Sequence, residues 1–132
     1  MEYLFRLTKG QDLRLELENY VKSHQIDSCV VICAVGSLLN AQIRLADGKT
    51  IKNFNQPFEI VSLMGTLAKG KAHLHLSVAD EKGLCIGGHL AYNTLINTTC
   101  EVVLLSLENY ELDRAFDKQT GYQELTIKEK GK

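Results

Sequence analysis

The chain has 132 residues, of which 45% are hydrophobic and one is proline, and a formal net charge of -1 from 15 basic and 16 acidic side chains. This length and composition predict one compact domain spanning residues 1–132 and exclude long disordered linkers. The even mixing of charges excludes a strongly basic stripe, and no apolar run is long enough to cross a bilayer, so we expect a soluble, cytoplasmic protein.

The first two predicted elements differ in their hydrophobic period. Residues 2–8, EYLFRLT, alternate between apolar and polar faces, which predicts a half-buried strand. After Gly10 the apolar residues recur at steps of three and four, which predicts one amphipathic helix over residues 11–24. His24 stands at the end of this helix, where we expect it to act as a C-terminal cap that favours the helix dipole.

The rest of the chain is dominated by strand patterns. Residues 28–36, SCVVICAVG, are a run rich in β-branched residues that predicts a central strand, and the Asp47-Gly48 turn signal predicts a hairpin between residues 38–46 and 49–54. Most connections are too short for a crossover helix, so we expect a mainly antiparallel sheet and an α+β fold whose open edges favour self-association. Further strands are predicted at residues 58–68, 71–79, 100–110 and 122–128.

The four cysteines, Cys29, Cys33, Cys85 and Cys100, contain no Cys-x-x-Cys spacing. Three of them lie within apolar runs. In the reducing compartment expected for this chain, we therefore interpret them as small buried hydrophobic residues rather than as a zinc or redox site.

Two histidines lie one residue apart in KAHLHLSVAD, residues 71–80. Side chains alternate along a strand, so His73 and His75 share one face while the leucines between and after them face the core. Their Cα atoms would lie roughly 6.6 Å apart, close enough for both rings to bind one ion with Zn–N bonds of about 2.0–2.1 Å. His89 is a third candidate, because the Gly-Gly pair before it lets the backbone approach another strand.

The spacing alone leaves other interpretations open. The histidines could be polar residues of a half-exposed sheet, or hydrogen-bonding groups at a subunit contact. Asp80 could orient an imidazole, or it could form the turn that ends the strand, and the turn is the favoured interpretation.

Residues 58–90, FEIVSLMGTLAKGKAHLHLSVADEKGLCIGGHL, resemble the plants-and-prokaryotes-conserved (PPC) domain. The shared signature is a Glu-Ile strand, a Gly turn, His-x-His-x-Ser-x-Ala-Asp and Gly-Gly-His-Leu. GQDLRLELENYV, VGSLLNAQIRLA with Arg44, and TTCEVVLL extend the resemblance over nearly the whole chain. The resemblance is to the stand-alone prokaryotic type, and it implies a curved antiparallel sheet with one principal N-terminal helix that assembles as a homotrimer.

The resemblance also implies a metal site formed by His73, His75 and His89, with zinc or another divalent cation as the cofactor. Such a cluster leaves a fourth position open for water or a small ligand. Catalysis would need a general base as well, for which Glu59 and Asp80 are the candidates. Whether the chain is an enzyme therefore stays open, and a trimeric scaffold whose histidines pack at an interface is a further alternative.

The family's name and its plant members imply a DNA-associated regulatory module. In plant proteins an AT-hook, a Gly-Arg-Pro element, enters the DNA minor groove ahead of this domain. The present chain has no such element, since its only proline, Pro57, is not in that context. The most basic stretch, TIKEKGK at residues 126–132, is expected to be a solvated tail. DNA is thus a partner suggested by the resemblance and unsupported by charge, and the alternative is a metal-dependent enzyme or small-ligand binder without DNA binding.

Overall fold

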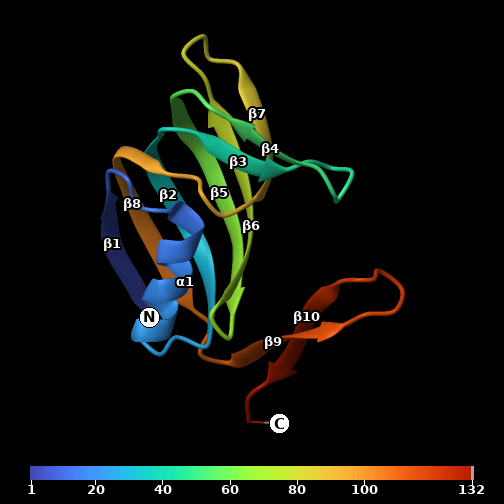
Figure 1. Ribbon diagram of the computed structural model, residues 1–132. Helices are drawn as coiled ribbons and strands as arrows, with labels where there is room; N and C mark the ends of the chain where they lie inside the picture. The colour runs from blue at the N-terminus through green and yellow to red at the C-terminus, as the bar shows by residue number, and fades with distance from the viewer. Residues whose placement is uncertain (132) are drawn as a thin grey trace.

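The computed structural model describes residues 1–131, in which one helix and ten strands are formed (Figure 1). Eight strands make one sheet in the order β1-β8-β2-β5-β6-β7-β3-β4, and β9 and β10 form a separate hairpin. The helix is α1 (Leu13–Ser23), and the strands are β1 (Glu2–Thr8), β2 (Ser28–Leu38), β3 (Ala41–Arg44), β4 (Ile51–Phe54), β5 (Phe58–Ala68), β6 (Lys71–Ala79), β7 (Cys85–Leu90), β8 (Ile96–Ser106), β9 (Tyr110–Phe116) and β10 (Gln123–Glu129).

Every strand pairing within the described residues is antiparallel. β2 lies between β8 and β5, so the β-branched run is a central strand as predicted. Together with one helix, this pairing confirms the predicted α+β fold.

The helix α1 packs against the sheet through residues spaced by three or four. Leu13, Leu17 and Val21 are fully buried, and the Asp12 side chain caps the first turn by accepting a hydrogen bond from the Leu15 backbone N–H. His24 is the C-cap residue, as predicted, and its backbone N–H donates to the carbonyls of the last turn. The helix therefore covers part of one face of the curved sheet, which we call the inner face (Figure 1).

The inner face holds the hydrophobic core. On β6, Leu74, Leu76 and Val78 are at most 2% exposed, whereas His73 and His75, which alternate with the leucines, are exposed. The predicted alternation of β6 is thus confirmed, and both imidazoles project from the opposite, outer face of the sheet.

Two strands were absent from the prediction. β7 contains the Gly-Gly pair, which has poor strand propensity, and β9, YELDRAF, has adjacent charged residues that interrupt its alternation, so neither gives a clear hydrophobic pattern. The predicted strand over residues 100–110 is wrong at its ends, because β8 starts at Ile96 and a turn follows Ser106.

Other predictions need partial correction. Residues 126–129 are exposed, as predicted for a solvated stretch, but they are not a tail, because they pair with β9 as part of β10. Lys132 lies outside the described residues. Cys29 and Cys100 are buried as predicted, but Cys33 and Cys85 are exposed, because Cys33 lies on the outer face of β2 and Cys85 begins β7 after a turn.

Within residues 1–131 no helix could span a membrane, since the single helix has 11 residues.

Candidate metal centre

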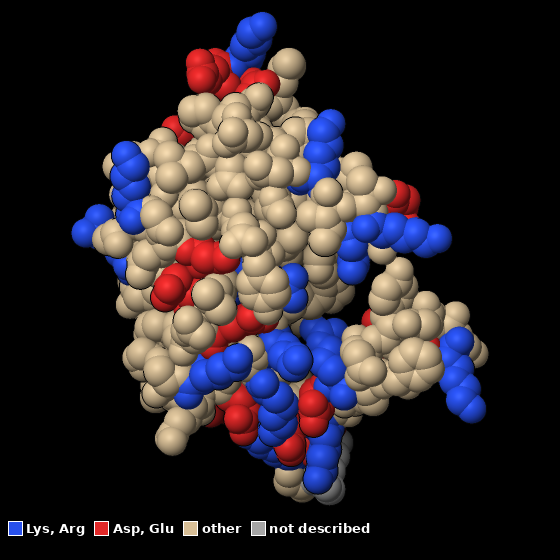
Figure 2. Space-filling view, viewed as in Figure 1, with Lys and Arg blue, Asp and Glu red and all other residues tan. Residues whose placement is uncertain are grey.

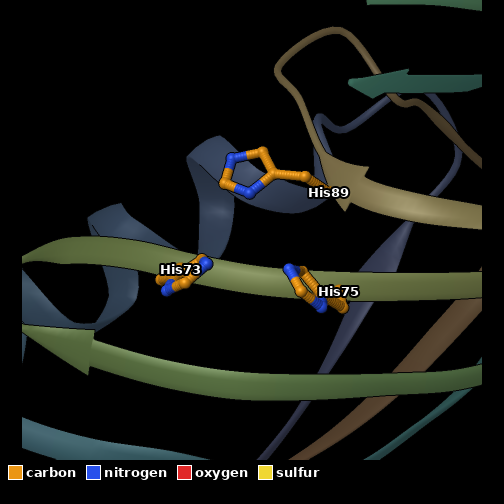
Figure 3. A group of neighbouring side chains, drawn as sticks. All are labelled: His73, His75 and His89. Carbon is orange, nitrogen blue, oxygen red and sulfur yellow. The ribbon is translucent and has the colours of Figure 1, made fainter. Parts of the chain in front are cut away.

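The strand register brings the three sequence-predicted histidines together. His75 and His89 are direct partners in the β6–β7 pairing, and His73 lies further along the same face of β6. The ring centroids of His73 lie 5.3 Å from those of both His75 and His89, and the other two rings are 6.0 Å apart. Figure 3 shows the three rings around a common space, with ring nitrogens of His89 and His73 directed into it. One candidate ligand atom from each histidine lies within 4.8 Å of the others.

Gly88 explains how His89 reaches this position. A Cβ atom on Gly88 would lie 2.5 Å from Ile43 Cγ2 and 2.9 Å from the Arg44 carbonyl oxygen, so only glycine permits β7 to approach β3 so closely. In that pairing His89 is the direct partner of Arg44. The sequence expectation that the Gly-Gly pair allows a close strand approach is confirmed.

The donor set fits a divalent cation of the zinc type. Three neutral imidazoles are a common zinc ligand set, and in a tetrahedral site their nitrogens would lie about 3.4 Å apart. Small rotations of the exposed His73 and His75 side chains would be enough to close the difference from 4.8 Å. His89 Nδ1 is buried and has no hydrogen-bond partner among the described residues, which is the condition of a nitrogen free to ligate.

The surroundings of His73 and His89 lower the pKa of both imidazoles. Burial, followed by the charges of Arg44 and Arg14, lowers the pKa of His89 to about 4. Burial, followed by the charge of Arg114, also lowers the pKa of His73, although Glu124 acts in the opposite direction. At neutral pH both rings are therefore neutral and carry the lone pair that a metal requires.

The structure does not bring the two predicted general-base candidates to the histidines. Glu59 is exposed on β5 and pairs with Ala79, at the other end of β6. Asp80 follows β6, and its side chain accepts hydrogen bonds from the backbone N–H groups of Lys82 and Leu84. The interpretation of Asp80 as a turn residue is confirmed.

A hollow of about 680 Å³ adjoins the histidines. One wall comes from the start of β6 and the ends of β3 and β7, and the other comes from the β9–β10 hairpin. Figure 2 shows Lys and Arg side chains gathered beside this hairpin, with Asp and Glu side chains among them. The sequence did not indicate most of the charged side chains that line this hollow, because no local pattern joins segments this far apart along the chain. The charged and histidine side chains that line it are Arg14, Arg44, Lys69, Lys71, His73, His89, Asp113, Arg114 and Glu124.

Fold and histidine cluster together define a class of protein: small antiparallel α+β domains with a three-histidine cluster on the outer face of a curved sheet. The family model described as "Plants and Prokaryotes Conserved (PCC) domain" matches residues 1–108. The chain belongs to this family, which is the PPC family expected from the sequence.

Several known proteins are similar to the chain over most of its length. A hypothetical protein from Salmonella cholerae-suis has 32% sequence identity and a TM-score of 0.94, covering 98% of this chain and 94% of the other. A metal-containing protein from Archaeoglobus fulgidus has 29% identity and a TM-score of 0.80, covering 96% and 93% of the two chains. The bifunctional protein GlmU of Synechococcus sp. (strain JA-3-3Ab) is 43% identical over 125 residues, which are 95% of this chain. The chain spans 20% of the length of the two curated relatives that it matches.

Proposed function

We propose that this chain is a metal-binding module in which His73, His75 and His89 hold one divalent cation, with zinc as the best chemical match. The observation that carries the proposal is the approach of three imidazole nitrogens to within 4.8 Å of one another, from two neighbouring strands. The neutral state of the His73 and His89 rings and the unpartnered Nδ1 of His89 support it. The similar protein from Archaeoglobus fulgidus is described as metal-containing, which also agrees with it.

Metal analysis of the purified protein tests this proposal. We expect protein stripped with a chelator and then exposed to Zn²⁺ to retain one ion per chain, and the His73→Ala variant to lose it. His24→Ala is the matched control, because His24 caps α1 and lies outside the cluster. Equal zinc uptake by the His73→Ala variant and the wild-type protein would overturn the proposal.

The outer face of the sheet supports the further proposal that copies of the chain assemble, with the homotrimer as the expected form. Large apolar side chains are exposed along adjacent strands of this face, and their contact with water is unfavourable. Leu4 of β1 is 72% exposed and pairs with Val103 of β8, which in turn pairs with Cys33 of β2. On β2 and β5, Val35, Val61 and Met64 are between 57% and 67% exposed. Light scattering coupled to size exclusion would give the number of chains in the assembly.

DNA association is a second candidate function. The observation that favours it is the local positive charge of the hollow, which the even charge distribution of the sequence conceals. Lys and Arg side chains close together can neutralise several phosphates. An anisotropy titration with duplex DNA at low salt tests it: we expect an affinity that falls steeply with salt, and the absence of binding at micromolar protein would remove this candidate.

A further inference from the structure

The basic side chains that line the hollow differ in whether they already have bonding partners within the protein. The guanidinium of Arg14 donates to the carbonyls of Leu90 and Ala72, and Lys69 is paired with Asp27 and Glu111. Arg14 and Lys69 therefore have a structural role, because each side chain links separate segments of the chain. Arg44 and Arg114 are the two guanidiniums of the hollow that have no acidic partner among the ion pairs of the described residues, and the Lys71 ammonium has none either.

Arg44 is fixed beside the histidine cluster. It is the direct strand partner of His89, so both side chains emerge on the same side of the sheet. Its Nε is buried without a hydrogen-bond partner among the described residues, which is a costly state for a charged group. Its guanidinium carbon lies 5.7 Å from the ring centroid of Tyr122, in the loop between β9 and β10.

Arg114 approaches the cluster from the other wall. It belongs to β9, and its Nη2 donates to Thr66 Oγ1 over 3.2 Å. Thr66 is the strand partner of His73, so this bond places the Arg114 guanidinium next to His73. Two guanidinium groups from separate parts of the chain thus flank the histidines, and both line the same hollow.

We propose that this hollow binds a small anion carrying a carboxylate or phosphate group, held by Arg44 and Arg114 directly beside His73 and His89. The inference rests on the proposed function, since it names the ligand class of that site, but the arginine contacts do not need a metal. Guanidinium groups match the planar oxygen pairs of carboxylates and phosphates, and their charge-assisted hydrogen bonds are among the strongest in proteins. A cation held by the histidines would add to the attraction.

Shape and charge favour a small ligand over a nucleic-acid backbone. A volume of about 680 Å³ falls in the range of small-molecule sites, which is roughly 300–1,000 Å³. Asp113 and Glu124 line the same hollow, and their carboxylates would repel an extended polyanion such as duplex DNA. One compact anionic group can instead lie between the two arginines.

Titration of inorganic phosphate and of succinate, followed by calorimetry and by the NMR signals of arginine side chains, tests the proposal. Both metal-free and Zn²⁺-exposed protein are titrated. We expect binding to each form, tighter with zinc, and a loss of roughly tenfold or more in affinity in the Arg44→Gln and Arg114→Gln variants. Lys82→Gln removes the same charge in the turn after β6 and should bind as the wild type does. Backbone NMR spectra confirm that each variant is folded.

Titrating both the metal-free and the Zn²⁺-exposed protein distinguishes a failure of this inference from a failure of the proposed metal site. If the arginine variants lose the anion but no protein retains zinc, the anion site is right and the metal site is wrong. If zinc is retained but neither anion binds, or if all three variants bind the anions equally, the inference is overturned. Binding of duplex DNA that depends on Arg44 and Arg114, without binding of phosphate or succinate, would overturn it in favour of a backbone contact.

Discussion

The two faces of the sheet are formed by the same strands, but they differ in how tightly their side chains are packed. On the inner face of β6, Leu74, Leu76 and Val78 are closely packed and nearly inaccessible. On the outer face of the same strand, His73 and His75 lie beside His89 of β7 (Figure 3), and His73 also lines the hollow beside the β9–β10 hairpin. Packing on the inner face stabilises the fold, whereas the side chains of the outer face are free for binding.

This contrast shows where each kind of mutation should act. A change on the inner face should alter the free energy of unfolding and leave the ligands of each folded molecule unchanged. A change on the outer face should alter binding or assembly with little effect on stability.

The largest expected effect is on the inner face. Leu76→Ala leaves a cavity in the core between β5 and β7, and we expect it to lower the free energy of unfolding by about 2–5 kcal/mol. Urea unfolding followed by circular dichroism measures this change. The folded fraction of this variant should still take up one zinc ion per chain, and a loss of zinc by the folded molecule would show that the two faces are coupled.

The next effect is on the outer face of the same strand. His75→Ala removes one of three proposed ligands, and we expect zinc affinity to fall by roughly 100-fold or more, since even indirect changes around metal sites cost about 10–100-fold. Because His75 is exposed, the free energy of unfolding of the metal-free protein should change by no more than about 0.5 kcal/mol. Competition with a chromophoric chelator measures the affinity, with His24→Ala as the control. A large loss of stability without a loss of zinc would reverse the roles assigned to the two faces.

The sequence predicted the two faces of β6 better than it predicted the site. Alternation was enough to place His73 and His75 opposite the leucines, because the period of a strand is a local property. The pairing of His75 with His89 depends on the register between two strands, and the sequence suggested it only through the Gly-Gly pair and the family resemblance. Arg114 could not be predicted, because it reaches His73 from a hairpin whose first strand has no clear hydrophobic pattern.

A smaller effect is expected in the assembly on the outer face. Met64 lies on β5 as the strand partner of His75 and is 67% exposed, so Met64→Asp would place a charge in the proposed contact between copies. We expect a shift towards single chains in light scattering at micromolar concentration, because an unpaired buried charge is costly. Leu84→Asp is the control, because Leu84 is similarly exposed in the turn between β6 and β7. An unchanged assembly in the Met64→Asp variant would exclude this part of the outer face from the contact.

The smallest expected effect is on the labelling rates of two cysteines, Cys29 and Cys33, which lie on opposite faces of β2. Burial raises the pKa of Cys29 to about 11, so at pH 8 only about one molecule in a thousand would carry the reactive thiolate, and Cys29 should resist iodoacetamide. Cys33 is exposed on the outer face of the single chain and pairs with Val103, so assembly through this face should slow its reaction. Mass spectrometry of the labelled peptides should therefore show slow reaction of Cys33 in the wild-type protein and fast reaction in the Met64→Asp variant. Cys85, exposed at the start of β7, should react quickly in both proteins and calibrates the reagent. Fast labelling of Cys33 in a wild-type protein that is assembled would mean that the copies meet on a different surface, since a covered thiol cannot reach the reagent at the rate of an open one.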